Sequence, residues 1–269
     1  MKIILSRKGF DGNTGGKPSP IMPDGTLLSM PIPSNDGVAY SDLKFNNVSY
    51  SKLLDDLGCK VSGGNCHVDP DIRPNIRCNT VERWKPAFGQ IDIAQGYLGN
   101  AGVREDDLFL FFGWFQRVDL KNGKYKYVSK SVKDFYQGNE MQIIFGYLQI
   151  GEIITDPDRI REYSWHPHTD NSKIYNKTNT LYTPRETLSF DNRLPGYGTL
   201  NFDVKRILTK KGYTPAKWDE RRFLMPNMLI GNRKNSSNEE GIIYYQGQWQ
   251  ELVLKENDET TKWAKHIIA

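Results

Sequence analysis

Two long hydrophobic segments in the middle of the chain predict the central strands of a β-sheet. Residues 107–115 (DLFLFFGWF) are apolar at nearly every position, which is typical of a strand that is covered on both faces. Residues 141–154 (MQIIFGYLQIGEII) form a second long run that is rich in β-branched and aromatic side chains. We therefore expect these two segments to form the buried part of the sheet.

Shorter patterns predict further strands beside these two. Residues 2–6 form a short apolar segment at the start of the chain. An Asn-Gly dipeptide separates residues 117–120 from residues 124–128, which predicts a hairpin with a type I′ turn. Residues 242–245 and 249–254 suggest a last hairpin around a Gln-Gly pair.

The helical signals are few and short. Three helices are expected, at residues 52–57, 90–98 and 258–267. Ser51 is the expected cap of the first helix, and Gly58 and Gly99 are expected to end the first and the second. Asn257 is the expected cap of the third helix.

These elements predict an α+β protein on a mixed, largely antiparallel sheet, with long loops and a few short helices. The 24 glycines and 14 prolines favour such a strand-and-loop fold over a helical bundle. No internal repeat or low-complexity linker divides the sequence. We therefore expect residues 1–269 to form a single domain.

Charge, cysteines and hydropathy limit the cellular compartments and partners that we expect for the protein. The net charge of +4, from 36 basic and 32 acidic side chains, permits a polyanionic partner without requiring one. The opening apolar run is short, and no segment reaches the roughly 18 apolar residues of a membrane-spanning helix. Cys59, Cys66 and Cys78 are interpreted as reduced thiols. These observations predict a cytoplasmic protein without membrane association.

A glycine-rich loop after the first strand is a candidate phosphate site. Residues 9–20 hold four glycines and two prolines, which argues against a regular element there. Backbone N–H groups of such a loop can approach an anion closely. The loop lacks the Gly-Lys-Ser/Thr of a Walker motif and the spacing of a dinucleotide fingerprint. The candidate binding residues are Arg7, Lys8, Gly9, Asp11, Gly15, Gly16, Lys17 and Ser19. The alternative is a plain surface connection held down by Phe10.

Histidine and aspartate residues in two segments are candidates for catalysis. In an extended segment His67, Asp69 and Asp71 would point to one side, where they could bind a divalent cation or supply a general base. Simple turn formation around the Asp-Pro-Asp sequence is the alternative. His166 and His168 have the same two-residue spacing, and the alternative for them is an ordinary loop.

The sequence assigns no metal ligand and no cofactor. The three cysteines and His67 match no familiar zinc spacing. A bound base would need an aromatic face and a polar edge contact. The candidate base-binding residues are Phe10, Gln90, Trp114 and Trp165.

Several of these segments occur together in one known family. They are residues 6–11 (SRKGFD), 15–20 (GGKPSP), 67–71 (HVDPD), 88–90 (FGQ) leading into 108–115, and 165–168 (WHPH). With this ordered set the chain resembles the third family of nucleotide-modification-associated domains, over nearly its whole length. The resemblance implies a role in systems that alter bases in bacterial and phage DNA. Residues 106–154 are also similar to the core of PUA-like barrels, which implies such a core at about residues 84–170.

Three functions remain open at this point. In the first, the protein binds a modified nucleotide in DNA or in free form and processes it as an enzyme, alone or with other modification-system proteins. In the second, it is a non-catalytic reader that stacks a modified base. In the third, it is a metal-dependent nucleotide or sugar transferase that uses Asp69 and Asp71. The enzyme hypothesis requires the aspartates and histidines to converge in one cleft.

Overall fold

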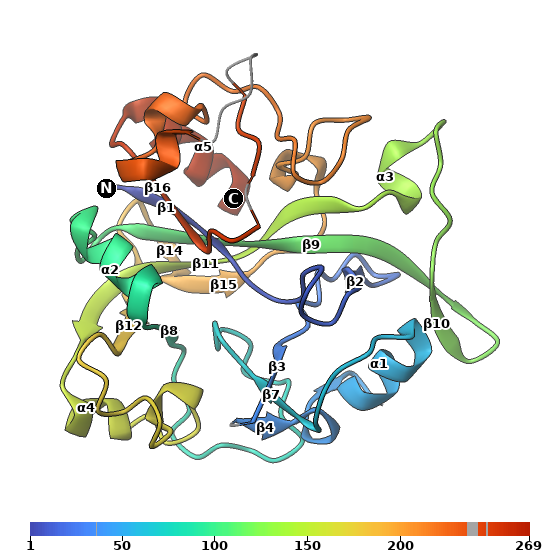
Figure 1. Cartoon of the computed structure of the whole chain (residues 1–269), viewed down its shortest axis with the longest axis horizontal. Coiled ribbons are helices and arrows are strands. Elements are labelled where there is room, and N and C mark those ends of the chain that lie inside the picture. Colours follow the sequence, from blue (N-terminus) through green and yellow to red (C-terminus); the bar gives the residue numbers. More distant parts are fainter. Residues whose placement is uncertain (36, 236–241, 246) are drawn as a thin grey trace.

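A nine-stranded mixed sheet forms the centre of the molecule (Figure 1). The computed structural model describes residues 1–35, 37–235, 242–245 and 247–269. The strand order is β16-β1-β9-β11-β12-β8, and the sheet curls into a half-barrel. Its two longest strands, β9 (Leu108–Lys121) and β11 (Met141–Ile154), run antiparallel. These are the two segments that the hydrophobic pattern predicts as central.

The remaining strands extend this sheet or form small sheets beside it. β1 (Ile3–Arg7) is parallel to β9 and antiparallel to β16 (Glu251–Leu254). On the other side, β12 (Thr180–Pro184) joins β11 to β8 (Phe88–Gln90). The other members are β2 (Ser19–Ile21), β10 (Lys124–Tyr127) and β15 (Tyr197–Thr199). The small sheets are β3 (Ile32–Ser34) with β7 (Asn65–His67) and β4 (Val38–Ala39), β5 (Lys44–Phe45) with β6 (Val48–Ser49), and β13 (Thr187–Leu188) with β14 (Asp191–Pro195).

The helices are short and lie around the sheet (Figure 1). The α-helices are α1 (Tyr50–Leu57), α2 (Asp92–Asn100), α3 (Phe135–Gly138), α4 (Pro157–Arg161) and α5 (Asp258–Ile268). Single 3₁₀ turns are η1 (Tyr40–Asp42), η2 (Pro167–Thr169), η3 (Val204–Arg206), η4 (Pro226–Met228) and η5 (Gly231–Asn235). Among the described residues, every helix is too short or too polar to cross a lipid bilayer.

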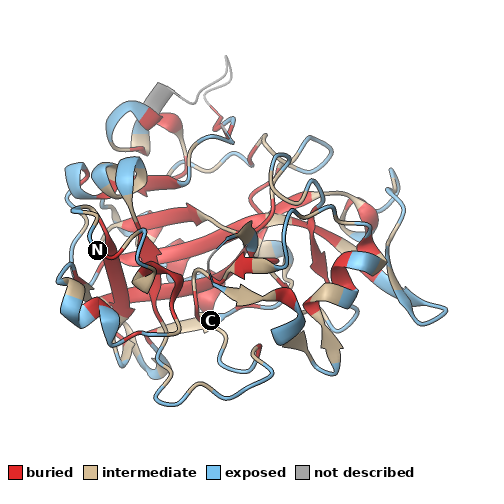
Figure 2. Ribbon diagram, turned by 60° about the horizontal axis from the view of Figure 1, so that its bottom comes forward, coloured by how far each residue is buried: buried red, intermediate tan, exposed pale blue. Residues whose placement is uncertain are grey.

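Both faces of the central sheet are buried, as Figure 2 shows. Successive residues of β9 alternate between two hydrophobic clusters: Leu110 belongs to the cluster under α5, and Phe109 and Phe111 belong to the cluster on the opposite face. A third cluster joins α1 to the first 30 residues and includes Phe10. Burial on both faces explains why residues 107–115 show no polar alternation.

Most of the elements that the sequence predicts are present in the structure. The α+β class and the mixed sheet are confirmed, and β11 has the predicted bounds. Asn122 and Gly123 both have positive φ, as a type I′ turn requires. Asn257 caps α5 by accepting a hydrogen bond from the N–H of Thr260. The predicted PUA-like core remains a prediction.

Four local predictions are wrong. The cap of α1 is Ser49 rather than Ser51, because Ser49 accepts the hydrogen bond from the N–H of Lys52. Gln90 ends a strand, and α2 starts two residues later. The proline-rich end of the first loop forms β2, which pairs with β9. In the last predicted hairpin, β16 pairs with β1, and the turn residue Gln246 lies outside the described residues.

Candidate functional site

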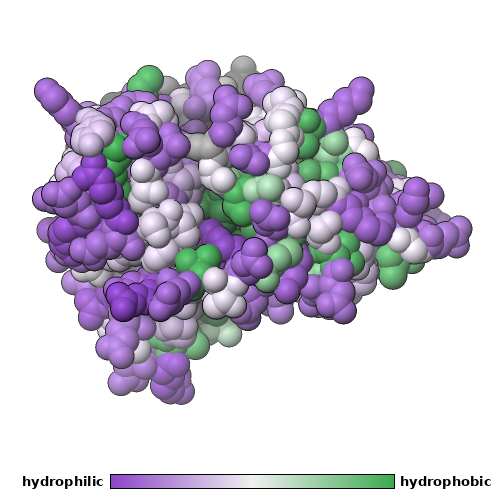
Figure 3. Space-filling model, turned by 90° about the horizontal axis from the view of Figure 1, so that it is seen from below, coloured by the Kyte–Doolittle hydropathy of each residue, from purple (hydrophilic) through white to green (hydrophobic). Residues whose placement is uncertain are grey.

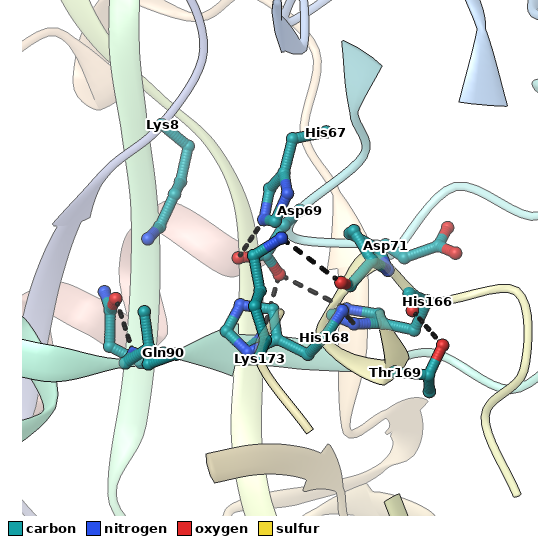
Figure 4. Close-up of polar contacts among 12 residues, drawn as sticks. Lys8, His67, Asp69, Asp71, Gln90, His166, His168, Thr169 and Lys173 are labelled. Atoms are coloured by element: carbon teal, nitrogen blue, oxygen red, sulfur yellow. Dashed lines mark hydrogen bonds and ion pairs between the residues drawn. The ribbon is translucent and has the colours of Figure 1, made fainter. Parts of the chain in front are cut away.

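A hollow of about 240 Å³ lies where β1, β7, β8 and η2 meet. Eight residues that the sequence singles out line it: Arg7, Lys8, Gly9, Asp11, His67, Asp69, Gln90 and His168. Thr14, Ile32, Ile91, Lys173 and Gln250 complete the lining. Four segments that are far apart in the sequence therefore meet around one space. Figure 4 shows the imidazole groups gathered around Asp69, with the amine of Lys8 extending toward Gln90.

Asp69 is the centre of the cluster, and its side chain is only 5% exposed. Its Oδ1 accepts a hydrogen bond from the N–H of Gly89 at 2.8 Å, and Nε2 of His166 lies 3.4 Å from the same oxygen. Its Oδ2 lies 3.9 Å from Nε2 of His67. Oδ1 is thus contacted by Gly89 and His166, and Oδ2 faces the imidazole of His67.

The hydrogen bonds of His168 define its tautomer. Nδ2 of Asn179 donates to the carbonyl of His168, so Oδ1 of Asn179 must face Nδ1 of the ring, at 2.6 Å. Nδ1 of His168 therefore carries the proton, and Nε2 presents a lone pair. The asparagine acts as an orienting partner of the kind that fixes ligating or basic histidines.

His166 contacts Asp69 but does not itself line the hollow. Its Nδ1 accepts a hydrogen bond from the N–H of His168 at 3.3 Å, so the N–H of the ring lies on Nε2. That Nε2–H points at Asp69, and the ring is only 1% exposed. His166 is therefore a positioning residue that orients the carboxylate.

Burial and the neighbouring groups set the charges in the cluster. Burial lowers the pKa of His168 to about 3, although Asp69 opposes this shift. Burial likewise lowers the pKa of His67. Burial would raise the pKa of Asp69, but its neighbours His166 and Lys8 outweigh this effect and lower the pKa. At neutral pH Asp69 is therefore a carboxylate, and the imidazoles of His67 and His168 are neutral.

Gly89 is required by the position of His168. A Cβ at residue 89 would lie 2.3 Å from Cδ2 and 2.5 Å from Nε2 of the His168 ring. The ring is held from the other side by Asn179, so it has no space to retreat. The glycine of the FGQ segment thus makes room for the imidazole.

We expect Gly89→Ala to destabilise the protein by about 1–3 kcal/mol through this overlap. Gly96→Ala is the matched control, since nothing lies within 4 Å of its Cβ position in α2, and it should gain up to about 1 kcal/mol. Urea unfolding measures both. The double variant Gly89→Ala, His168→Ala should recover part of the loss. Equal stabilities of the two single variants would contradict a close contact between Gly89 and His168.

A buried glutamate that the sequence did not indicate supports the cationic side of the hollow. Glu251 is fully buried in β16, and its Oε1 accepts hydrogen bonds from Ser6 at 2.9 Å, from Lys8 at 3.2 Å and from Gln90 at 2.7 Å. In the sequence, the only indication that Glu251 is important is that it is a charged residue within the otherwise largely apolar segment 249–254. Glu251 fixes Lys8 at the edge of the hollow, and it also occupies the Gln90 amide, which was expected to contact a base.

Two further cationic groups line the hollow. Arg7 forms an ion pair with Asp11 at 2.7 Å, and this arginine lowers the pKa of Asp11 against the effect of its burial. Lys173 follows η2, and burial lowers the pKa of its amine. Lys173 lies five residues beyond the histidine pair, in a segment that has no recognisable sequence motif.

Asp71 lies outside the cluster, contrary to the geometry expected from the sequence. Its carboxylate accepts two hydrogen bonds from Arg77, at 3.1 and 2.7 Å, and one from Nε1 of Trp84 at 3.1 Å. β7 ends at His67, so the alternation of an extended strand does not continue to residue 71. Figure 4 shows the side chain of Asp71 turned away from Asp69.

Several other predicted residues also lie away from the hollow. Gly15, Gly16 and Lys17 belong to a turn that Asp11 closes, with hydrogen bonds to the N–H groups of Asn13 and Thr14. Ser19 is buried and accepts a hydrogen bond from the N–H of Met30. The loop therefore contributes its first residues to the hollow, and its glycine pair does not line it.

The predicted aromatic residues are spread over three places. Phe10 is 1% exposed and packs in the core. Trp114 lines a different pocket, and its Nε1 donates to Glu140 at 3.1 Å. Trp165 lines a cleft of about 630 Å³ that lies beside His166.

The surface seen in Figure 3 is mostly hydrophilic, and patches of hydrophobic residues are visible near its centre.

Comparison with known proteins gives one family. Residues 2–261 match the model of a family described as nucleotide modification associated domain 3. No curated protein and no solved structure matches the chain.

Proposed function

Because the chain belongs to the nucleotide modification associated domain 3 family, we propose that it is an enzyme that binds and processes a nucleotide in the hollow around Asp69. The observation that carries this proposal is the convergence of His67, Asp69 and His168 with Lys8 and Lys173 on one space. Buried titratable groups with shifted pKa values in a cleft are typical of catalytic sites.

The lining of the hollow suits two parts of a nucleotide. Lys8, Lys173 and Arg7 supply positive charge for a phosphate group. The same lining also supplies the carboxylate of Asp69 and Nε2 of His168, which can accept a proton or a metal bond. The hollow has about 240 Å³, below the range of about 300–1,000 Å³ for pockets that enclose drug-sized ligands. It therefore suits one end of a nucleotide, with the rest outside.

The two alternatives have less support. A reader of modified bases needs an exposed aromatic face in its pocket, but Phe10 is buried and Trp114 and Trp165 line other spaces. A transferase that uses Asp69 and Asp71 around one cation needs both carboxylates together. Asp71 is committed to Arg77 and Trp84, so this pairing is not supported.

Lys173→Met tests the phosphate side of the hollow. The variant keeps the aliphatic stem and removes the charge, so we expect binding of deoxynucleoside 5′-monophosphates to weaken about tenfold or more, as for loss of a charged hydrogen bond of about 1.5–3 kcal/mol. Lys177→Met, at an exposed position nearby, should bind as the wild type does. Isothermal titration at fixed salt measures both, because salt alone changes such affinities. Equal affinity of both variants would remove Lys173 from the proposal.

A further inference from the structure

The cluster around Asp69 also has the composition of a metal site. Ligand atoms of His67, Asp69 and His168, one from each residue, lie within 4.8 Å of one another. Two imidazole nitrogens and one carboxylate oxygen are the donor set of mononuclear sites that leave open positions for substrate. We propose that this triad binds one divalent transition-metal ion, in the class of zinc, iron(II) or cobalt(II). The inference relies on the proposed function only for the role of the ion.

The surrounding contacts leave one donor atom of His168 and one of Asp69 available for coordination. Nδ1 of His168 is bonded to Asn179, so Nε2 is the available donor atom. Oδ1 of Asp69 is occupied by Gly89 and His166, so Oδ2, which lies 3.9 Å from Nε2 of His67, is available. Partners of this kind, behind the ligands, orient the first coordination shell in metal sites.

The distances require only a modest contraction on binding. Metal bonds of about 2.1 Å place neighbouring ligand atoms roughly 3.0–3.4 Å apart in octahedral or tetrahedral geometry. The ligand atoms here lie within 4.8 Å. A contraction of at most about 1.4–1.8 Å between these atoms would bring the site to bonding distance. His67 is the most exposed of the three side chains.

The donor set favours transition-metal ions over the common hard cations. Magnesium and calcium prefer shells of oxygen ligands, whereas this triad offers two nitrogens. His67, Asp69 and His168 would hold the ion at the wall of the hollow that Lys8 and Lys173 also line. An anionic group of a substrate could therefore reach the ion and the two lysines together.

Cobalt(II) titration of chelator-treated protein, without nucleotide, tests the inference. We expect one cobalt per chain, with visible d–d absorption bands typical of nitrogen and oxygen ligands and a micromolar or lower Kd. Magnesium at the same concentration should leave the spectrum unchanged. His67→Ala should weaken cobalt binding at least tenfold, and His266→Ala, on the exposed face of α5, should bind as the wild type does.

Two outcomes would overturn the inference: cobalt binding well below one equivalent, or equal binding by His67→Ala and His266→Ala. If circular dichroism shows that His67→Ala is unfolded, Asp69→Asn takes its place, with the same expected loss. Cobalt binding by a protein that binds no nucleotide would keep the metal site and remove the proposed function. Nucleotide binding without cobalt binding would do the reverse.

Discussion

Asp69→Asn is expected to reduce formation of the modified nucleoside at least about 100-fold, within the range that general acid–base groups contribute. The amide has the shape of the carboxylate, and its oxygen can still accept the hydrogen bond from Gly89 and lie beside Nε2 of His166. The variant loses the negative charge that faces His67. It should therefore fold normally and lose function.

Mass spectrometry of nucleosides from cells that carry the wild-type or variant gene measures this effect. Circular dichroism and thermal unfolding of the purified variant serve as the folding control. Wild-type amounts of the modified nucleoside in Asp69→Asn cells would show that the carboxylate has no part in the reaction.

Asp71→Asn is expected to have the opposite effect, a large loss of stability with the site itself intact. Asp71 is fully buried and Arg77 is only 8% exposed, and the two share two hydrogen bonds. Removing one charge leaves the guanidinium buried without its counter-ion, which typically costs about 3–5 kcal/mol. Urea unfolding at neutral pH measures the change in the free energy of unfolding.

A matched control is available in the ion pair of Asp191 and Arg193, whose arginine is exposed. Asp191→Asn should leave the urea midpoint unchanged, because exposed ion pairs contribute little. At a temperature where Asp71→Asn remains folded, it should bind nucleotides as the wild type does. Stability equal to that of the wild type would contradict the structural role of Asp71.

Two aspartates two residues apart thus have different roles, and the sequence alone could not separate them. Their expected convergence depended on an extended chain from residue 67 to residue 71, but β7 ends at His67. The partners that decide the outcome come from other segments. Asp69 contacts Gly89 and His166, whereas Asp71 contacts Arg77 and Trp84.

The long strands were predictable because their pattern is local. β9 and β11 are read from continuous apolar runs, and the turn at residues 122–123 is read from its Asn-Gly dipeptide. The convergence of the histidine pair with His67 and Asp69 was also expected, and the structure brings them together.

The residues that complete the hollow could not be predicted, because their importance depends on distant contacts. Glu251 is 243 residues from Lys8 in the sequence, and only strand pairing between β1 and β16 brings them together. Lys173 and Asn179 lie in irregular segments with no motif of their own. A single acidic residue in an apolar strand was a weak signal for Glu251.

Imidazole NMR during a nucleotide titration tests most directly whether this hollow is the binding site. The chain has four histidines, of which His67, His166 and His168 surround Asp69 and His266 lies on the surface of α5. Addition of a deoxynucleoside 5′-monophosphate should shift the ring resonances of the first three and leave His266 unchanged. Unchanged resonances of His67 and His168 at saturating nucleotide would contradict a binding site at Asp69.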